Sequence, residues 1–393
     1  MQPLPITAYT AVSALGRGLA PALRALRSEQ GGLRPCDFED AELATWIGRV
    51  EGLEAHPLDG RLASYDCRNN RLARLGLETD GFAERVREAA GRYGPERVGL
   101  FLGTSTAGIR ETERLIRDHG DGPPPDSYHY RESHNLFSLA DFAARYLGLA
   151  GPAFVISTAC SSSAKVFAAA HRHLRAGVCD AAVVGGVDSL CLTTLYGFNA
   201  LELVSASPCR PWDRDREGLS IGEGAAFALL DPQGGARGGA ALLGYGESSD
   251  GYHISTPHPE GRGARAAMAA ALERAELGPA EVDYVNLHGT ATPSNDASED
   301  RAVADLFPEG VACSSTKGWT GHTLGAAGAM EAVFALLAVE EGFAPGTLNL
   351  EDPDPALTVA LLRHGRAAPV AAAMSNSFGF GGSNCSLVFG RQP

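Results

Sequence analysis

The chain has 393 residues, 44% hydrophobic and 20% charged, which predicts a folded protein with a large core and excludes a disordered chain or a coiled coil. It carries 47 acidic and 33 basic residues, a net charge of −14, and no basic tract. We therefore expect neither a nucleic-acid partner nor docking on an anionic membrane. Lysine occurs only at Lys165 and Lys317, so 31 of the 33 basic residues are arginine.

The eight cysteines are scattered without a CxxC pair, which argues against a zinc site or a disulfide framework. The longest uninterrupted apolar run, 332–339, is far shorter than the roughly 20 residues that span a bilayer. The first residues, MQPLPITAYTAVSALGRG, lack the charged and apolar blocks of a signal peptide. We expect a cytoplasmic protein without a membrane span.

Short apolar runs alternate with alanine-rich stretches of helical pattern, which is typical of a layered α/β fold. The predicted strands are 97–102, 153–157, 181–185, 282–287 and 386–389. The predicted helices are 81–93, 161–176, 263–275 and 325–341. Proline and glycine at 119–135 and 250–263 predict two long loops.

Two pairs of segments repeat between the halves of the chain. GPAFVISTACSSSAKVFAAAHRHLRAG, from Gly151, has the same order of strand, turn and small-residue helix as GVACSSTKGWTGHTLGAAGAMEAVFALLAVEEG, from Gly310. VGLFLGTSTAG and VDYVNLHGTATPS both run from a strand into G-T-x-T. We infer an internal duplication and predict two domains, 1–232 and 233–393. The alternative is a chance likeness between ordinary α/β units.

Cys160 follows an apolar strand and precedes a predicted helix that begins with three serines. The amides and the dipole of a helix start favour an anion, so this position predicts a lowered thiol pKa and an activated sulfur. An inert buried cysteine is the alternative.

Two histidines also follow strand-like or glycine-rich segments. His288 ends VDYVNLH, at the strand end where α/β folds place ligands, and His322 lies in TGHTLGAAG. They are 34 residues apart without a close Cys, Asp or Glu, so we predict no metal site. A cysteine and two neutral imidazoles suit acyl-thioester chemistry, in which the sulfur carries the acyl group and the imidazoles donate hydrogen bonds to an oxyanion or enolate. Hydrogen-bonded structural histidines are the alternative.

The two lysines invite different interpretations. Lys317 precedes His322 by five residues, and in a chain that otherwise uses arginine it suggests a compact ammonium paired with Glu331, orienting the histidines. A solvated lysine is the alternative. We interpret Lys165 as structural, in a surface or interface ion pair. The motif NSFGFGGSN, 376–384, can present amides to an oxyanion and lacks the context of a phosphate loop.

Together these motifs resemble the thiolase-fold condensing enzymes, specifically the elongating beta-ketoacyl-acyl-carrier-protein synthases. The resemblance covers about residues 95–389 and rests on TACSSS, CRPWDRDREGLSIGEG, SSDGYH, HGTATP, STKGWTGHTLGAAG and NSFGFGGSN. It implies a five-layered α-β-α-β-α fold of two duplicated halves, the first with the nucleophile and the second with both histidines. It implies no cofactor, and substrates bound to an acyl-carrier protein by phosphopantetheine.

The resemblance also implies a reaction. Cys160 would accept an acyl chain, while His288 and His322, supported by Lys317 and Glu331, would hold a malonyl thioester during decarboxylation. The carbanion would attack the acyl thioester and give a 3-ketoacyl-carrier protein and CO2, in fatty acid synthesis or in a related polyketide or polyene pathway.

Further residues match binding positions of that family. The amides of Cys160 and Phe380 would form the oxyanion hole, and Phe380 would gate between the acyl pocket and the malonyl site. Thr290 and Thr292 would bind the pantetheine amides, and Phe198 would line the acyl pocket.

The pattern separates this chain from related enzyme classes. Cys385 lies outside the turn that would hold the second cysteine of a degradative thiolase, and His322 stands where initiating synthases use asparagine. A thioester hydrolase is one alternative. The other is a partner subunit of a heterodimeric synthase, for chain length or scaffolding, with little activity of its own; a chain-length subunit would lack Cys160.

The partners and the pathway are less defined. We expect a homodimer, or a heterodimer with a related synthase subunit. Because carrier proteins are acidic, a local arginine patch is expected at the pocket mouth, and Arg68 and Arg71 fall where relatives present basic residues. The absence of a T-G-x-G turn near the amino terminus and Leu219 in place of phenylalanine make a specialised polyketide or polyene pathway a competitor to fatty acid synthesis.

Overall fold

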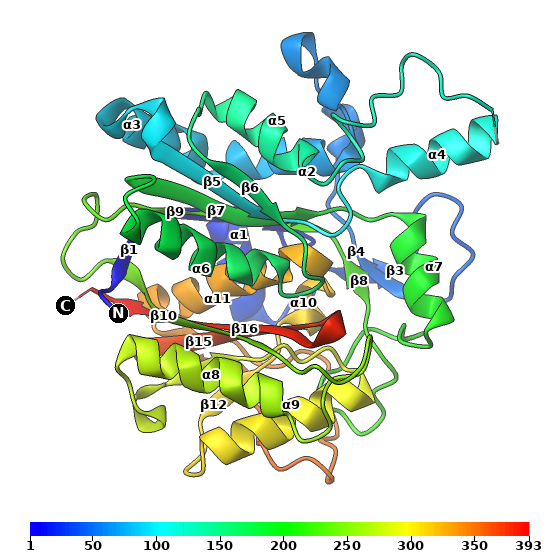
Figure 1. Ribbon diagram of the computed structural model, residues 1–393. Coiled ribbons are helices and arrows are strands. Elements are labelled where there is room, and N and C mark those ends of the chain that lie inside the picture. Colours follow the sequence, from blue (N-terminus) through cyan, green and yellow to red (C-terminus); the bar gives the residue numbers. More distant parts are fainter. Residues whose placement is uncertain (121, 393) are drawn as a thin grey trace.

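The computed structural model describes residues 1–120 and 122–392, and its helices and sheets alternate in five layers (Figure 1). The helices on the outer faces are α2 (Arg68–Leu77), α3 (Phe82–Tyr93) and α5 (Ser138–Leu147) on one side, and α8 (Arg262–Ala275) and α9 (Pro293–Leu306) on the other. Helices α6 (Ser162–Arg175) and α11 (Ala327–Glu341) lie between the sheets. The predicted α-β-α-β-α architecture is confirmed.

Each half of the chain forms a five-stranded unit, and the two units have the same topology. The strand orders are β6-β5-β7-β9-β1 and β12-β11-β15-β16-β10, and in both the first three strands are parallel and the others antiparallel. The strands of the first unit are β1 (Leu4–Ser13), β5 (Val98–Gly103), β6 (Ala153–Ile156), β7 (Ala181–Asp188) and β9 (Gly224–Leu230). Those of the second are β10 (Ala240–Ser249), β11 (Tyr284–Asn286), β12 (Ala312–Ser314), β15 (Ala372–Gly379) and β16 (Ser383–Arg391). The predicted duplication is therefore present in the fold.

Strand β1 joins the two units, because its first residues also pair with β10, Leu4 with Leu242 and Pro5 with Ala241. The predicted domain boundary at 232/233 falls in the connection from β9 to β10, and the division of the chain there stays a prediction. The remaining short elements are β2 (Gly16–Arg17), α1 (Leu19–Ser28), β3 (Leu33–Pro35), β4 (Trp46–Gly48), α10 (Lys317–Thr320), β8 (Ile221–Gly222), β13 (Phe343–Ala344) and β14 (Arg366–Ala367).

The middle layer explains why two stretches of the chain are rich in small residues. Helix α11 is buried from Ala327 to Val339 because apolar sheet surfaces cover both of its faces, and its one charged residue in that range is Glu331. Helices α6 and α11 meet near their first turns, where a Cβ on Gly328 would lie 2.5 Å from the backbone nitrogen of Ala164. Small side chains thus bring the two helix starts, and the loops before them, to one central point.

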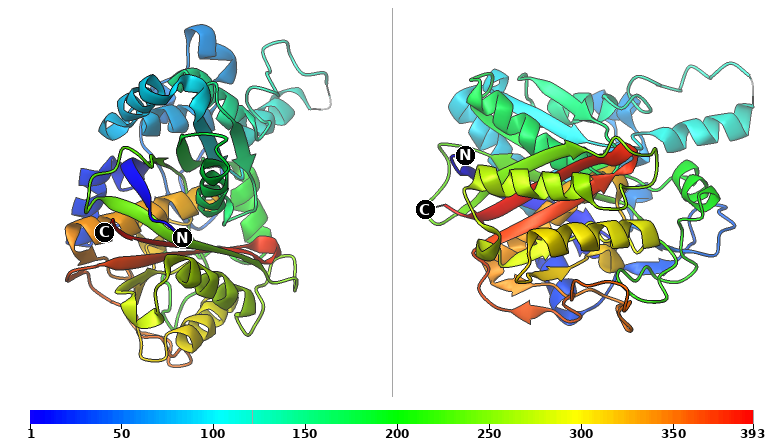
Figure 2. Two further views of the ribbon diagram at one scale, coloured as in Figure 1. Left: turned by 60° about the vertical axis from the view of Figure 1, so that its left-hand side comes forward. Right: turned by 60° about the horizontal axis from the view of Figure 1, so that its bottom comes forward.

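Two further helices extend from the body of the molecule. Helices α4 (Ile109–His119) and α7 (Leu192–Ala200) lie beside each other at one edge, and α4 projects outward (Figures 1 and 2). The two chain ends lie close together at the opposite edge (Figure 1). In the described part of the chain, no helix combines the length and the apolar character needed to cross a bilayer.

The C-terminal glycine motif, 376–384, covers the end of one strand, a turn and the start of the next strand. Its first residues, 376–379, belong to β15, and residues 383 and 384 begin β16, so the turn is only Phe380–Gly382. Gly381 and Gly382 have φ of 76° and 71°, which glycine adopts without a steric penalty. Two left-handed glycines thus allow a tight hairpin between β15 and β16.

Candidate active site

Cys160 lies in the connection from β6 to α6, two residues before the helix begins. The preceding Ala159 has φ of 52°, a left-handed conformation that is strained for a residue with a Cβ. This sharp turn directs the Cys160 side chain into a central pocket, where its residue is 6% exposed.

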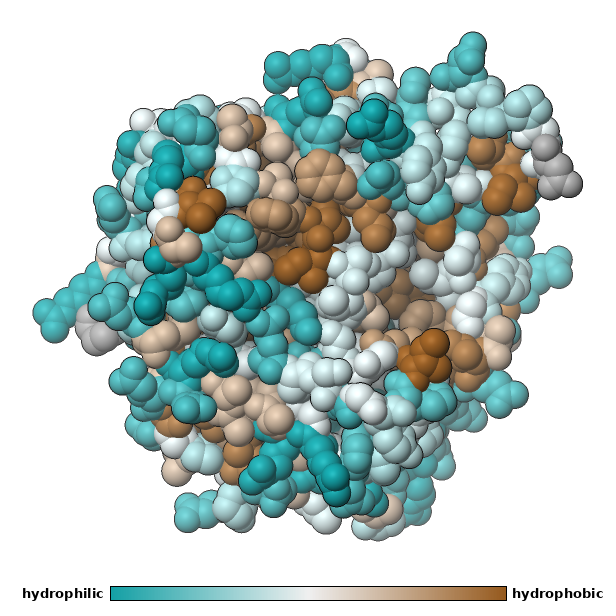
Figure 3. Space-filling view, in the orientation of Figure 1, coloured by the Kyte–Doolittle hydropathy of each residue, from teal (hydrophilic) through white to brown (hydrophobic). Residues whose placement is uncertain are grey.

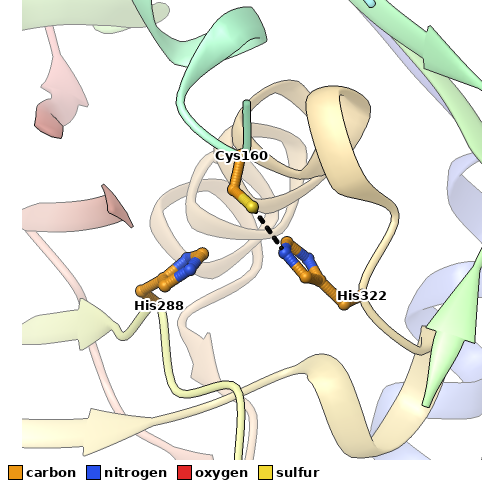
Figure 4. A group of neighbouring side chains, drawn as sticks. All are labelled: Cys160, His288 and His322. Carbon is orange, nitrogen blue, oxygen red and sulfur yellow. Dashed lines mark hydrogen bonds between the residues drawn. The ribbon is translucent and has the colours of Figure 1, made fainter. Parts of the chain in front are cut away.

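Both predicted histidines point toward this sulfur (Figure 4). His288 follows β11 by two residues, and His322 lies in the connection from β12 to α11. The Nε2 atom of His322 lies 2.9 Å from Cys160 Sγ, and the two imidazole rings are nearly perpendicular with centroids 5.3 Å apart. The fold thus brings together three residues from three connections of the two halves.

Lys317 and Glu331 lie behind His288 as a buried pair. The Lys317 ammonium donates to a Glu331 carboxylate oxygen and to the backbone carbonyl of His288, and it lies 3.5 Å from His288 Nδ1. An ammonium has no acceptor, so Nδ1 must accept and the His288 proton resides on Nε2. The sequence suggested that this pair orients both histidines, and the direct contact is with His288.

Burial dominates the protonation states of the site. It raises the pKa of Cys160 to about 12, although Lys317 and the Phe380 amide act in the opposite direction. Burial, with an added effect of Lys317, holds the pKa values of His288 and His322 well below 6.5. The expectation of a lowered thiol pKa is wrong, because desolvation of a thiolate outweighs the helix start and the ammonium. All three groups are neutral at pH 7.

A pocket leads to these residues and is lined by Thr290, Thr292, Phe198 and Phe380 as well. The Thr290 and Thr292 hydroxyls lie 2.8 Å apart, and the Phe198 and Phe380 rings stack at 5.5 Å with an interplanar angle of 27°. The predicted binding residues therefore share one pocket with Cys160.

The glycine hairpin lies directly on the nucleophile. A Cβ on Gly379 would be 2.8 Å from the Thr158 carbonyl oxygen and 3.2 Å from the Cys160 nitrogen, so this position leaves no room for a side chain. Close backbone contact places the Phe380 amide against the Cys160 sulfur. The Cys160 and Phe380 amides can therefore face one oxygen of a bound thioester.

The distance between Cys160 Sγ and His322 Nε2 distinguishes a hydrogen bond from a shared metal ion. Cys160, His288 and His322 offer ligand atoms within 4.8 Å of one another. Sulfur and nitrogen on a shared tetrahedral zinc would be about 3.5 Å apart, given bonds of about 2.3 and 2.0 Å. The observed 2.9 Å between Sγ and Nε2 is shorter than this and matches a hydrogen bond.

One buried carboxylate of the site was not predicted. Glu299 on α9 accepts hydrogen bonds from the backbone amides of His288 and Gly289, both at 2.8 Å, and from Asn376 at 3.2 Å. Burial raises its pKa to about 7. Residues 296, 299 and 300 of α9 are all acidic and buried, and their helical spacing directly after the His288 motif is a signal that could have identified it.

A second unpredicted carboxylate, Asp188, ends β7. It accepts from the amides of Ser105, Thr106 and Gly325, at 2.6–3.1 Å, and from the Thr104 hydroxyl at 2.7 Å. It thereby ties the connection after β5 to the start of α11, below the pocket.

The expectation that Arg68 meets a carrier protein is wrong, whereas the expectations for Arg71 and for an interface ion pair of Lys165 stay predictions. Arg68 is 1% exposed, and its guanidinium binds Glu223 at 2.6 and 2.8 Å, because α2 turns this residue into the core. It cannot meet a carrier protein there, while the partly exposed Arg71 pairs with Asp66. Lys165 makes no ion pair with any residue the structure describes.

Comparison with known proteins gives matches over most of the chain. The beta-ketoacyl synthase N-terminal domain matches residues 71–235, and the beta-ketoacyl synthase C-terminal domain matches residues 239–351. The mitochondrial 3-oxoacyl-[acyl-carrier-protein] synthase of Arabidopsis thaliana is 43% identical over 62% of this chain and 57% of its own length. The 3-oxoacyl-[acyl-carrier-protein] synthase 2 of Vibrio cholerae is 32% identical over 98% of each chain.

A solved structure is similar over nearly the full length. A chain of the complex between the ketosynthase ApeO and its chain length factor ApeC, from Xenorhabdus doucetiae, superposes with a TM-score of 0.89 and 38% identity, covering 99% of this chain and 98% of that one. Both family domains, the full-length relative and the shared fold agree with the cysteine and two histidines of the pocket. The chain belongs to the beta-ketoacyl synthase family.

Proposed function

We propose that this chain catalyses a decarboxylating condensation of an acyl group on Cys160 with a malonyl-acyl-carrier protein, giving a 3-ketoacyl-acyl-carrier protein and CO2. The observation that carries the proposal is the Cys160 Sγ at 2.9 Å from His322 Nε2, with the His288 imidazole beside it in one pocket. The relatives named above are themselves 3-oxoacyl-[acyl-carrier-protein] synthases.

In the first half-reaction the sulfur of Cys160 attacks the acyl thioester of a carrier protein. The thiol proton has an acceptor within reach at His322 Nε2, and the oxygen of the tetrahedral intermediate faces the amides of Cys160 and Phe380. The bond from the acyl carbon to the carrier sulfur breaks, and that sulfur leaves as a thiol with the transferred proton. A strained turn at Ala159 keeps the nucleophile fixed for the attack.

In the second half-reaction the malonyl thioester oxygen accepts a hydrogen bond from His288 Nε2, and another from His322 in the tautomer that carries its proton on Nε2, which replaces the accepting tautomer once Cys160 is acylated. Loss of CO2 leaves an electron pair as an enolate, which the neutral N–H groups stabilise. The enolate carbon forms a bond to the acyl carbon, the bond to Cys160 sulfur breaks, and one proton from solvent restores the thiol. The Lys317 ammonium at His288 Nδ1 keeps the proton of that ring on Nε2, where it is needed.

The remaining pocket residues have binding roles in this proposal. Thr290 and Thr292 line the approach to Cys160 with hydroxyls that can bind the amides of a pantetheine arm. Phe380 separates the acyl and malonyl positions, and Phe198, stacked on it, forms a wall of the acyl side.

The test uses the intact chain with acyl-loaded and malonyl-loaded carrier protein. We expect an acyl mass increment on Cys160, followed by CO2 release and a 3-ketoacyl product two carbons longer. No adduct with competent carriers would overturn the proposal, and free acid in place of the longer product would identify a hydrolase instead. Presenting starters of several lengths, including unsaturated ones, would separate a fatty acid from a polyketide or polyene pathway.

We also propose that the chain pairs with a second synthase-type chain along β6, and that it works in the cytoplasm, where its eight free cysteines stay reduced. Strand β6 ends the sheet order, so one edge has no partner among the described residues, and its Phe154 is 46% exposed. Hydrophobic side chains gather near the centre of that face (Figure 3). ApeO was solved with a chain length factor, which supports a heterodimer as well as a homodimer.

Changing Phe154→Glu should convert the dimer to a monomer in mass photometry, because a charge on a paired edge opposes strand addition. A purified chain that is monomeric alone but pairs with a chain length factor would select the heterodimer. A monomer in both conditions would contradict the pairing. No observation favours a purely structural subunit, because Cys160 and both histidines are in place.

A further inference from the structure

Helix α7 carries a wall of the pocket but is held by few buried contacts. Of its nine residues only Leu195 is fully buried, while Tyr196 is 42% exposed and the following Leu201 is 51% exposed. Phe198 projects from this helix and stacks on Phe380 at 5.5 Å. The position of the Phe198 ring thus depends on helix α7, which few buried side chains stabilise.

A single carboxylate anchors the start of α7. Glu113 of the projecting helix α4 accepts a hydrogen bond from the Leu192 amide at 3.0 Å and another from the Thr193 amide at 2.6 Å. These are two of the amide groups that a helix start leaves without intrahelical partners, and a negative charge there also interacts favourably with the helix dipole. Glu113 therefore caps a helix to which it does not belong.

The middle of α7 has a second feature that bears on its rigidity. Gly197 directly precedes Phe198, and a Cβ built on it would meet no heavy atom within 4 Å. A glycine inside a helix lowers its stability relative to alanine because the unfolded backbone is freer. Helix α7 is thus stabilised at its start by Glu113 of another helix and destabilised in its middle by Gly197, next to Phe198.

We propose that Glu113 is a positioning residue that sets the acyl-chain selectivity of the site by fixing the start of α7 and, through it, Phe198. The inference rests on the proposed condensing function. Because the two rings stack, Phe380 can move only if Phe198 moves with it or if the stacking contact breaks. A long acyl chain displaces the Phe198 side of the pocket further than an acetyl group does. A loosened α7 then favours long chains over short ones, and a stiffened α7 does the reverse.

The experiment measures the ratio of the rates at which octanoyl- and acetyl-loaded carrier protein acylate Cys160, followed by intact mass. For Glu113→Ala we expect this ratio to rise about fivefold, equivalent to about 1 kcal/mol, which is the size of one helix cap. Glu113→Gln should give a smaller rise, because one amide oxygen can still accept. Gly197→Ala should lower the ratio.

The matched control removes another acid from the same helix. Asp118 lies exposed in the last turn of α4 and makes no side-chain hydrogen bond or ion pair with the residues the structure describes, so Asp118→Ala should keep the ratio of the unchanged chain. A ratio taken within one preparation does not depend on the folded fraction, so partial unfolding of a variant cannot produce the shift. If Glu113→Ala fails to fold, Glu113→Gln and Gly197→Ala still decide the outcome.

Two results would overturn the inference while leaving the proposed function intact. One is an unchanged ratio in the Glu113 variants and in Gly197→Ala, and the other is an equal shift in Asp118→Ala. Failure of the unchanged chain to form any acyl adduct would instead reject the condensing function, and the selectivity inference with it. Release of CO2 from malonyl carrier, which does not require the acyl wall, should vary by less than about twofold in every variant.

Discussion

The two halves of the molecule share one topology but place different chemistry at its centre. In the N-terminal half the connection from β6 to α6 carries the sulfur of Cys160, and in the C-terminal half the equivalent connection from β12 carries His322. The connection after β11 carries His288, whereas its counterpart after β5 has Thr104 and Thr106, both bound to Asp188. A duplicated scaffold has thus kept its packing and changed the side chains at the end of its strands.

This difference suggests that the two halves of the chain contribute differently to the two half-reactions. The N-terminal half supplies the nucleophile and, through α7, a wall for the acyl chain. We expect the C-terminal half, which supplies both imidazoles and the buried pair that supports them, to bind the malonyl group, while its His322 also accepts the thiol proton during acylation. Variants that impair one half-reaction and spare the other would support this difference between the halves, and variants that impair both equally would contradict it.

The largest effect is expected in the N-terminal half. Cys160→Ala should abolish condensation, a loss of at least about a thousandfold, because no other group near the pocket can form the acyl-enzyme. CO2 release from malonyl carrier should fall by less than about tenfold, since both imidazoles remain. Product analysis and CO2 trapping on the same samples would measure the two rates. Loss of decarboxylation together with condensation would contradict this difference between the halves.

The protonation state of Cys160 gives a second prediction. Burial raises its pKa to about 12, so the thiolate is a minor species at neutral pH. Between pH 7 and 10 the rate of alkylation of Cys160 by iodoacetamide should rise about tenfold per pH unit, about a thousandfold in all, because it follows the thiolate fraction. Peptide mass mapping separates Cys160 from the other cysteines. A plateau below pH 9 would mean that the resting pair is thiolate and imidazolium.

In the C-terminal half, His288→Ala should slow decarboxylation by about a hundred- to a thousandfold, the usual effect of removing one oxyanion donor. Acylation of Cys160 should change by less than about tenfold, because His322 still accepts the thiol proton. Single-turnover acylation followed by mass, compared with CO2 release, gives both numbers. An equal loss in both assays would place His288 in both half-reactions and remove the contrast between the halves.

The two lysines allow a matched pair of variants. Lys317→Ala should slow decarboxylation about ten- to a hundredfold and acylation less, since it removes the group that fixes the His288 tautomer. It should also destabilise the fold by about 3 kcal/mol, because Glu331 stays buried without its partner. Burial already raises the pKa of Glu331 to about 7, so this carboxyl can then take up a proton. Lys165→Ala should change neither rate, and equal losses in both half-reactions of Lys317→Ala would refute the tautomer role.

The sequence was informative wherever a function depends on residues within one connection. Strand-to-helix motifs around Cys160, His288 and His322 predicted the fold class, the duplication and the members of the pocket, because short connections hold their residues at one edge of a sheet. The pairing of Lys317 with Glu331 was predicted from the unusual choice of lysine and from the family resemblance. These features are local, so they can be recognised along the chain.

What the sequence did not predict depends on contacts across the fold. The raised thiol pKa of Cys160 results from burial in a pocket that residues of both halves line, which no local motif reveals. The burial of Arg68 depends on Glu223, 155 residues away, and the cap of α7 depends on Glu113 from another helix. Long-range packing decides whether a charge is exposed or paired, and a single sequence does not show which distant residues come into contact.

The smallest predicted effect concerns Glu299, whose carboxylate accepts the His288 and Gly289 amides. Glu299→Gln keeps the shape but turns one acceptor into a donor facing an N–H group, so His288 should shift slightly. We expect decarboxylation to fall about three- to tenfold and acylation to stay within about twofold, as for other outer contacts of a reacting group.

Asp300→Asn is the matched control for Glu299→Gln, because Asp300 is an equally buried acid on α9 whose partners, Thr358 and Val359, lie away from the pocket. It should lower the melting temperature without changing the ratio of the two half-reactions. If both variants shift that ratio alike, the effect reflects the stability of α9. If only Glu299→Gln does, the C-terminal half holds its histidine through a backbone anchor, whereas the N-terminal half holds its cysteine through a strained turn.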